Sequence, residues 1–314
     1  MIATVTANPS TDRTIELPGT LDRGAVHRAS RVVDQPGGKG VNVARVVHAA
    51  GEQTVALLPA RRDDPFLETL HAVALPNQAV SVDDLVRTNI TITEADGTTT
   101  KINESGAALN EAAAAQLRSL IVARAETADW LALCGSLPPG LPDDWYADLV
   151  RELGGRCRIA VDTSGAPLLA VAQTPAALLK PNAHELAEIV GGDADAMESA
   201  AAAGDPGATA AAARTLATET GGSVLTTLGG AGALLTTADG TWFATAPAVT
   251  VRSTVGAGDS SLAGYLIAHV RNASAESLLR SAVAHGSAAA SLPGTTPPTP
   301  DLLDEAGVTV TRIS

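Results

Sequence analysis

The sequence predicts an α/β protein in which helices cover both faces of a largely parallel sheet. Short apolar segments alternate with helical segments along most of the chain, as in βαβ units. Polar and glycine-rich clusters directly follow the apolar segments, which is where ligands bind in open α/β sheets. The 314 residues, 45% of them hydrophobic, suffice for one large core or for two domains. No change in composition marks a second domain.

In the first third of the chain, strands are predicted both for the main sheet and for a separate small sheet. Two apolar strands flank one helix, which opens after a glycine-rich turn and ends before Gly51. These elements are Ile2–Ala7, Val41–Ala50 and Thr54–Pro59. Thr14–Leu17 reads as a separate short strand, and Asp96-Gly97 joins the alternating segments Leu85–Glu94 and Thr98–Asn103 as a hairpin turn. These three segments predict a small sheet outside the main core.

The rest of the chain continues the alternation of strands and helices. Strands are expected at Trp130–Cys134, Arg158–Val161, Ala177–Leu179 and Ser223–Leu228, with a hairpin at Ala233–Ala244 around Asp239-Gly240. Helices are expected at residues 111–125, Asp143–Leu153 and Glu185–Val190, in the alanine-rich stretch 199–217 with a break at 204–207, and twice near the C-terminus.

Composition and charge disfavour several classes of protein. The net charge is −13, with 34 acidic against 21 basic residues, so neither nucleic acid nor an anionic membrane is expected as a partner. Cys134 and Cys157 lack the spacing of a zinc site or a disulfide framework. The sequence shows no signal-peptide pattern and no run of the roughly 18 apolar residues that span a membrane. We therefore expect a cytoplasmic protein.

One stretch near the C-terminus carries the strongest chemical signal. Residues 253–261 read STVGAGDSS and precede a helical segment. Small residues at a helix start let an anion approach free N–H groups, so Gly256, Ala257 and Gly258 predict an anion-binding site. Asp259 beside such an anion is suited to accept a proton, which indicates phosphoryl transfer to a hydroxyl group. The alternative is a glycine turn whose acid only favours the helix dipole.

Other common motifs do not fit. Gly37-Gly38-Lys39-Gly40 lacks the Ser or Thr and the spacing of a P-loop, and Gly229-Gly230-Ala231-Gly232 is not GxGxxG. There is no GxSxG elbow, and His184-Glu185 does not extend to HExxH. P-loop, Rossmann, serine-hydrolase and zinc-protease sites are therefore disfavoured.

Several segments resemble a known family in their order along the chain. They are Asn8-Pro9 with Asp12, Gly37 to Arg45, Gly135 to Gly140, Lys180-Pro181-Asn182 with Glu185, Thr227-Leu228-Gly229 with Gly232, and Ser253 to Asp259. Together they resemble the ribokinase-like sugar kinases of the phosphofructokinase B type. The resemblance implies a ribokinase-like three-layer α/β/α domain over residues 1–314, with a mostly parallel central sheet. It also implies a small β-sheet lid made by segments about 12–36 and 85–104.

The resemblance further implies roles for individual residues. Asp259 is similar to the family's catalytic base, and Gly256, Ala257 and Gly258 to its anion hole. Three residues are candidates for binding the hydroxyl groups of the acceptor sugar: Asp12, Gly38 and Asn42. The candidates for binding the phosphate that the sugar carries are Lys39 and Arg87, with Arg28, Asn103 and Ser136 as further contacts. The candidates for ATP are Asn182, Thr227, Gly229 and Gly232, and Glu185 together with Asn182 would arrange Mg²⁺. In this family lids often pair two subunits, so a homodimer through the lid is also implied.

Some of these residues have simpler interpretations. Asn182 and Glu185 could form a capping pair at a helix start, and Asp12 could cap a turn. Arg87 could be a surface charge on a strand. Lys39, in contrast, opposes the positive end of a helix, a cost that an anionic ligand would offset.

The reaction expected from the resemblance is ATP-dependent phosphorylation of a ketohexose phosphate. Lys39 and the run Arg87-Thr88-Asn89 are more similar to the branch that uses fructose 1-phosphate than to the 6-phosphofructokinases. The alternatives are a 6-phosphofructokinase or tagatose-6-phosphate kinase, a nucleoside or vitamin kinase, and a sugar-phosphate-binding protein without turnover. One segment departs from the family: residues 59–66 read PARRDDPF where a glycine-rich loop near the sugar is usual. This departure concerns one wall of the sugar pocket.

Overall fold

The computed structural model describes residues 1–313, and its centre is a ten-stranded sheet. The strand order is β14-β13-β12-β11-β10-β9-β8-β1-β4-β5. The seven strands from β11 to β5 run parallel, and β12, β13 and β14 extend the sheet antiparallel. The strands are β1 Ile2–Thr6, β4 Thr54–Pro59, β5 Asn77–Val80, β8 Trp130–Cys134, β9 Arg158–Asp162, β10 Leu178–Leu179, β11 Ser223–Thr227, β12 Ala233–Thr237, β13 Gly240–Thr245 and β14 Thr309–Arg312.

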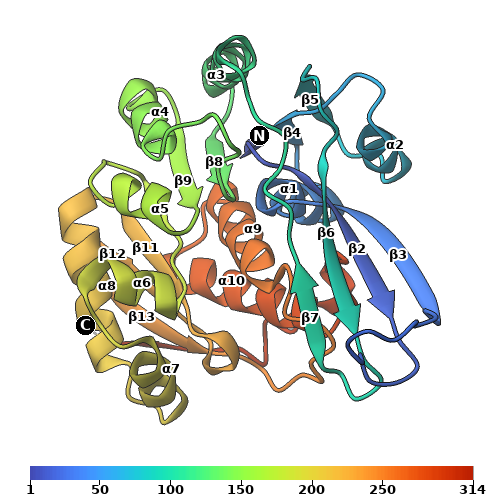
Figure 1. Ribbon diagram of the computed structural model, residues 1–314. Coiled ribbons are helices and arrows are strands. Elements are labelled where there is room, and N and C mark those ends of the chain that lie inside the picture. The colour runs from blue at the N-terminus through green and yellow to red at the C-terminus, as the bar shows by residue number, and fades with distance from the viewer. Residues whose placement is uncertain (314) are drawn as a thin grey trace.

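Helices cover the sheet on both faces (Figure 1). One face packs against α3 Glu111–Ala125, α4 Trp145–Leu153, α5 Ala166–Val171, α6 Ala183–Val190, α7 Ala194–Ala202 and α8 Gly207–Thr220. The other packs against α1 Lys39–Ala49, α9 Ala257–Val270 and α10 Ala275–Ala290. Helix α2 Pro65–Ala72 closes a smaller core beside β4 and α1, and two 3₁₀ turns lie at Gly229–Ala231 and Pro300–Leu302.

Side-chain alternation along the strands explains the two cores. In β8, Leu131 and Leu133 enter the core beneath α3 and α4, whereas Trp130, Ala132 and Cys134 enter the core beneath α1, α9 and α10. Both faces of this central strand are apolar because both are covered, as is usual in parallel sheets. The chain is thus a three-layer α/β/α fold, as the sequence predicts.

A second sheet of four strands lies outside these layers (Figure 1). Its order is β3-β2-β6-β7, with β2 Ser10–Glu16, β3 Arg31–Gly37, β6 Arg87–Thr93 and β7 Thr99–Ile102. The hairpin expected around Asp96-Gly97 is present as β6 and β7. Strand β2 leaves the carboxyl end of β1 after only a few residues, so this small sheet adjoins the end of the main sheet where polar residues collect.

Several elements go beyond the sequence prediction. Strand β3 was not predicted; five of its seven residues are exposed or half-buried, so it lacks the apolar alternation of a buried strand. Helix α2, β5, α5 and β14 were also not predicted. The unusual segment 59–66 ends β4 and starts α2: Asp64 accepts a hydrogen bond from Phe66 N at 2.9 Å, and Arg61 pairs with Asp63 at 2.6 Å. The alanine-rich stretch forms α7 and α8 with the expected break.

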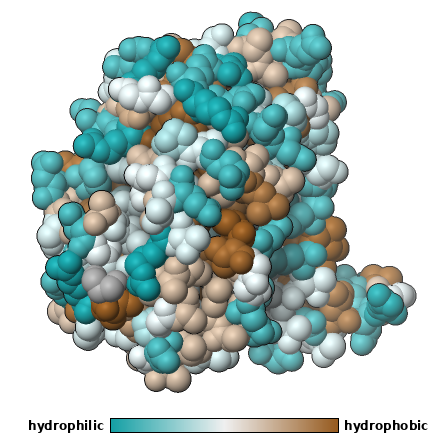
Figure 2. Space-filling view, turned by 90° about the vertical axis from the view of Figure 1, so that its left-hand side faces the viewer, coloured by the Kyte–Doolittle hydropathy of each residue, from teal (hydrophilic) through white to brown (hydrophobic). Residues whose placement is uncertain are grey.

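Within residues 1–313, no helix is long and apolar enough to cross a membrane. The face shown in Figure 2 is mainly hydrophilic or neutral, with brown, apolar residues in small groups.

Candidate active site

Polar residues at the carboxyl ends of β10 and β11 line one cleft, whereas Asn8 and Ser136, which follow β1 and β8, line a neighbouring cavity. The cleft has a volume of about 1020 Å³. Its polar lining includes Lys39, Lys180, Asn182, Thr227 and Asp259. These residues come from α1, from the segment that follows β10, from the last position of β11 and from the start of α9. Topology brings them together, because each parallel strand delivers its following loop to the same edge of the sheet.

The segment that the sequence predicts as an anion site forms the start of α9. Gly256 precedes the helix with φ of 78°, a left-handed conformation that glycine adopts without strain. Ala257 and Gly258 form the first turn, and both line the cleft. Free N–H groups and the positive end of the helix dipole suit this turn to an oxyanion.

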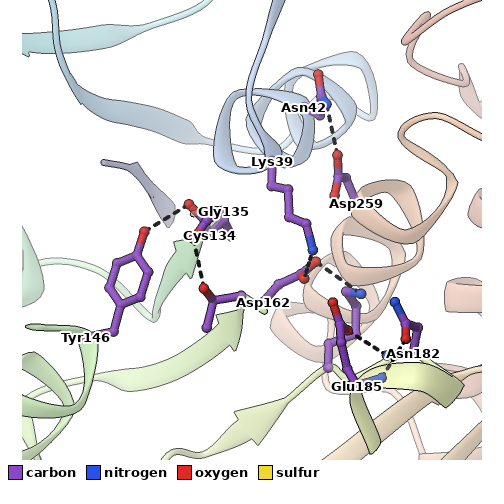
Figure 3. Close-up of polar contacts among 11 residues, drawn as sticks. Lys39, Asn42, Cys134, Gly135, Tyr146, Asp162, Asn182, Glu185 and Asp259 are labelled. Atoms are coloured by element: carbon purple, nitrogen blue, oxygen red, sulfur yellow. Dashed lines mark hydrogen bonds and ion pairs between the residues drawn. The ribbon is translucent and has the colours of Figure 1, made fainter. Parts of the chain in front are cut away.

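Asp259 lies in the same turn and is buried, with 7% of its surface exposed. Its Oδ2 accepts a hydrogen bond of 2.8 Å from Asn42 Nδ2 on α1 (Figure 3). Burial, and then the charge of Asp162, raise the pKa of Asp259 to about 6, against the lowering effects of Lys39, Asn42 and Lys180. A carboxylate with this pKa is ionised at neutral pH yet basic enough to accept a proton, which suits a general base.

Lys39 opens α1 and reaches across the cleft to Asp162 at the end of β9 (Figure 3). Its Nζ lies 2.5 Å from Asp162 Oδ1, and 35% of its side chain is exposed. Burial alone would lower the pKa of Lys39, but Asp162, Asp259 and Glu185 raise it above the ordinary value. The lysine is therefore charged, and its unfavourable position at a helix start is offset by a buried carboxylate.

Asp12, Gly38 and Asn42 lie where the small sheet meets α1. Asp12 accepts hydrogen bonds from Ser10 Oγ at 2.8 Å and Asn89 Nδ2 at 3.3 Å. Burial raises the pKa of Asp12, although Ser10, Asn89 and Arg87 partly oppose this effect. Gly38 has φ of 95°, and a Cβ there would lie 2.7 Å from Thr6 Cγ2, so no side chain fits.

Arg87 and Ser136 line a neighbouring cavity of about 510 Å³ together with Asn8. Arg87 donates to the backbone oxygens of Glu104 at 2.8 Å and Asn8 at 3.3 Å, and Asn8 Nδ2 donates to Ser136 Oγ at 3.3 Å. The stem of Lys39 lies beside this cavity, because a Cβ on Gly135 would be 3.8 Å from Lys39 Cβ. Of the predicted phosphate contacts, Arg87 and Ser136 thus share one cavity, whereas Lys39 lines the main cleft and pairs there with Asp162. Asn103 is exposed just after β7.

Asn182 and Glu185 form the capping box that the sequence left open as an alternative. Asn182 Oδ1 accepts from Glu185 N at 2.9 Å, and Glu185 Oε2 accepts from Asn182 N at 2.8 Å. Asn182 nevertheless lines the cleft, where it bridges to Thr227 on the next strand. A capping role and a ligand role are compatible, because the cap uses only one carboxylate oxygen of Glu185.

The 3₁₀ turn after β11 supplies the glycine-rich wall of the cleft. Gly229 and Gly232 line it, and Gly232 has φ of 115° in a place where a Cβ would clash with the carbonyl oxygen of Ala244, so no side chain fits. Beyond this turn the lining becomes apolar, at Ala246, Pro247, Ala248, Val249, Val283 and Ala290. An apolar pocket next to glycine amides and an anion site matches the parts of a nucleotide.

Two residues of the site are absent from the predicted set. Asp162 and Lys180 are both buried and paired, with Asp162 Oδ2 3.1 Å from Lys180 Nζ. The signal was present, because both end or follow predicted strands. Their charge alone did not show that one would neutralise the other.

The fold and the cleft define a phosphotransferase with a ribokinase-like architecture. Residues 5–302 match the pfkB family of carbohydrate kinases, and the chain belongs to this family. It is 36% identical over 275 residues to a 1-phosphofructokinase of Rhodobacter capsulatus, covering 84% of this chain and 82% of that protein. It is also 36% identical over 311 residues to a 1-phosphofructokinase of Haloferax volcanii, covering 97% of this chain and 95% of that one.

Solved structures agree with this assignment. Phosphofructokinase-2 from Escherichia coli, in complex with substrates and products, superposes with a TM-score of 0.87 at 31% identity and 96% coverage of both chains. Ribokinase from Thermotoga maritima superposes with a TM-score of 0.73 at 18% identity, covering 96% of this chain and 97% of that one, which shows the shared fold. The chain is thus an ATP-dependent sugar-phosphate kinase with a ribokinase-like fold, as the motifs predict.

Proposed function

We propose that this kinase transfers the terminal phosphoryl group of ATP to fructose 1-phosphate, forming fructose 1,6-bisphosphate. The observation that carries the proposal is the juxtaposition of two sites. Asp259 and the anion hole lie in the nucleotide cleft, and Arg87 lines the adjoining cavity with Ser136 and Asn8. An acceptor that already bears a phosphate could anchor it in the second cavity and direct a hydroxyl to the first. The curated relatives named 1-phosphofructokinase support the same acceptor.

In the proposed mechanism Asp259 accepts the proton of the attacking hydroxyl group. Asn42 orients this carboxylate through the 2.8 Å hydrogen bond, and the high pKa keeps it basic. Amide groups of residues 256–258 stabilise the charge of the transferring phosphoryl group. Asp12, Asn42 and Gly38 contact the sugar, and closure of the small sheet as a lid excludes water.

ATP fits the cleft in this proposal, with its phosphates toward α9 and the glycine turn and its base in the apolar part. For Mg²⁺ the donor set is sparse. No group of three or more His, Cys, Asp or Glu residues suited to a metal is found within residues 1–313. Mg²⁺ commonly uses one or two carboxylates together with substrate phosphates and water. The free oxygen of Glu185 fits such an ion, which would neutralise charge on the nucleotide when bound.

The closest competing acceptor is a ketohexose 6-phosphate. Escherichia coli phosphofructokinase-2 in complex with fructose-6-phosphate superposes with a TM-score of 0.85, and the second cavity does not by its volume distinguish the two esters. A coupled ADP-release assay over fructose 1-phosphate, fructose 6-phosphate, tagatose 6-phosphate and free fructose tests the proposal. Highest kcat/KM with fructose 1-phosphate is expected. A preference for a 6-phosphate would show that the 6-phosphate, and not fructose 1-phosphate, is the substrate. A preference for free fructose would refute a binding site for the phosphate of the sugar.

We also propose that the chain is one domain whose lid segments, about 12–36 and 85–104, pair two copies in a homodimer. The outer face of the small sheet carries Ile15, Ile90 and Ile92, together with Val32 and Ile102, each 54% exposed. Apolar side chains on an outer sheet face favour association. Sedimentation of the wild type and of Ile102→Lys tests this, with a shift toward monomer expected in the variant.

A cytoplasmic location is part of the proposal and is supported by two cysteines that are free thiols.

A further inference from the structure

A fully buried carboxylate lies beneath the cleft and has none of the roles assigned above. Asp162 ends β9, and none of its side chain is exposed. The backbone around it is fixed on both sides. Gly135 N donates to Asp162 O at 2.8 Å, and Lys180 N donates to Val161 O at 3.0 Å. Asp162 therefore occupies a rigid point where the ends of three neighbouring strands meet.

Two cations of the cleft converge on this carboxylate, and Figure 3 shows the contact of one of them, Lys39. Lys39 Nζ lies 2.5 Å from Oδ1, and Lys180 Nζ lies 3.1 Å from Oδ2. Burial alone would raise the pKa of Asp162, but Lys180 and Lys39 hold it below its usual range. Buried ion pairs seldom add stability over apolar residues of similar volume. Their presence here points to a use for the lysine positions.

Both lysines are directed at the reacting part of the cleft. A Cβ on Gly258 would lie 3.4 Å from Lys180 Nζ, so this ammonium group borders the anion hole. Lys39 lines the same cleft and attracts Asp259 electrostatically. Each ammonium group thus has Asp162 on one side and the anion hole or the base on the other.

We propose that Asp162 is a positioning residue for phosphoryl transfer, which holds the ammonium groups of Lys39 and Lys180 beside the anion hole. Asp162 itself does not touch the substrate. The inference rests on the proposed role of Asp259.

The charges that face Asp259 come from three elements. They are Asp162 at the end of β9, Lys39 on α1 beside the neutral Asn42, and Lys180 after β10. Among these groups Asp162 is the one that raises the pKa of Asp259, next to the larger effect of burial. Removing its charge should therefore weaken the base, and it should also release both lysines from their positions. The first effect changes the pH dependence and the second lowers turnover.

The test compares wild type, Asp162→Asn, Asp162→Glu and the control Asp129→Asn. Asp129 precedes β8 at the opposite end of the sheet and pairs with the N-terminal amine, so its change also removes one ion pair. The kcat at saturating ATP and fructose 1-phosphate is measured by ADP release from pH 5 to 8. For Asp162→Asn we expect kcat to fall about a hundredfold, as for misplaced catalytic groups, and its acid limb to move to lower pH. Asp162→Glu should keep the acid limb but lose turnover, and Asp129→Asn should match wild type.

Two results with a folded Asp162→Asn variant would overturn the inference. One is an Asp162→Asn enzyme with kcat within about threefold of wild type. The other is a lower kcat with an unmoved acid limb, which would indicate a merely structural carboxylate. Should Asp162→Asn fail to fold, Asp162→Glu decides, and full turnover in that variant refutes positioning. Asp259→Asn is measured in parallel. If Asp259→Asn stays active, the assignment of Asp259 as the base fails. If Asp259→Asn is inactive, an unmoved acid limb in Asp162→Asn refutes the role of Asp162 and leaves that of Asp259 intact.

Discussion

Replacing Asp259 by asparagine should abolish turnover and at the same time stabilise the protein. The substitution keeps the shape and can keep a hydrogen bond with Asn42, but it removes the group that would accept the proton. Loss of a general base typically costs about 10²–10⁴ in rate. Because the anion hole and Lys39 remain, ATP and sugar phosphate should still bind with nearly unchanged affinity.

The gain in stability follows from the pKa of this carboxyl group. A rise from 3.8 to about 6 means that the folded protein binds this proton more tightly than the unfolded chain does. At about 1.4 kcal/mol per pKa unit, ionised Asp259 destabilises the fold by on the order of 1–3 kcal/mol above pH 6. The penalty declines as the pH falls through 6 toward 3.8, where both states are protonated. Asparagine carries no such penalty.

The two effects are measured separately. Turnover is followed by ADP release, and unfolding free energy by urea denaturation at pH 7.5 and pH 5. The variant should be more stable than wild type at pH 7.5, and the difference should shrink at pH 5. More than a tenth of the wild-type kcat would refute Asp259 as the base. A variant less stable than wild type at both pH values would refute the electrostatic account of its burial.

Three further substitutions test other parts of the site. Glu185→Gln should raise the Mg²⁺ concentration needed for activity with little loss of stability, because glutamine also completes a capping box. A normal metal titration together with lower thermal stability would leave Glu185 only a capping role. Asp193→Asn at the cap of α7 is the matched control. Arg87→Ala should raise the KM for the sugar phosphate about ten- to hundredfold with little change in the KM for ATP. The control Arg13→Ala, on the outer face of the same sheet, should change neither KM. Equal weakening of the binding of both substrates by Arg87→Ala would contradict a phosphate role. Gly40→Ala should lower the free energy of unfolding by about 1–3 kcal/mol, since the added Cβ would lie 2.6 Å from the Val5 carbonyl oxygen of β1. A denaturation midpoint equal to that of the wild type would show that α1 can shift to make room for it.

Sequence periodicity predicted most of the core because buried strands and helices must show it. Strand β8 and helix α3 were predicted with their observed bounds, Trp130–Cys134 and 111–125. Strands β3 and β14 were not, since both have few buried residues and take their conformation from pairing with β2 and β13. Edge strands of this kind depend on a partner that is distant in sequence, which local patterns do not report.

The site was predictable where a backbone conformation demands a residue type. Gly38 and Gly256 both have positive φ, and both mark helix starts that sequence reasoning selected. Pairing between charges was not predictable, because it depends on which strand ends become neighbours. Lys39 was predicted as a free phosphate ligand, and its partner Asp162 became visible only in the fold. That phosphate role for Lys39 stays a prediction.

The charges around the cleft give a physical reason for a metal in the proposed reaction. In the group that interacts with Lys39 and Asp259, Lys39 and Lys180 contribute two positive charges, whereas Asp162, Asp259 and Glu185 contribute three negative ones when ionised. Lys101 and Glu198, which also line the cleft, carry opposite charges and leave this balance unchanged. The N-terminus of α9 adds only about half a positive charge. A triphosphate that enters this cleft would therefore meet nearly balanced or slightly negative surroundings, in a chain whose net charge is already −13. A divalent cation bound to the phosphates would reverse that balance without a third positively charged side chain beside Asp259, where Lys39 and Lys180 already lower the pKa of this carboxyl group.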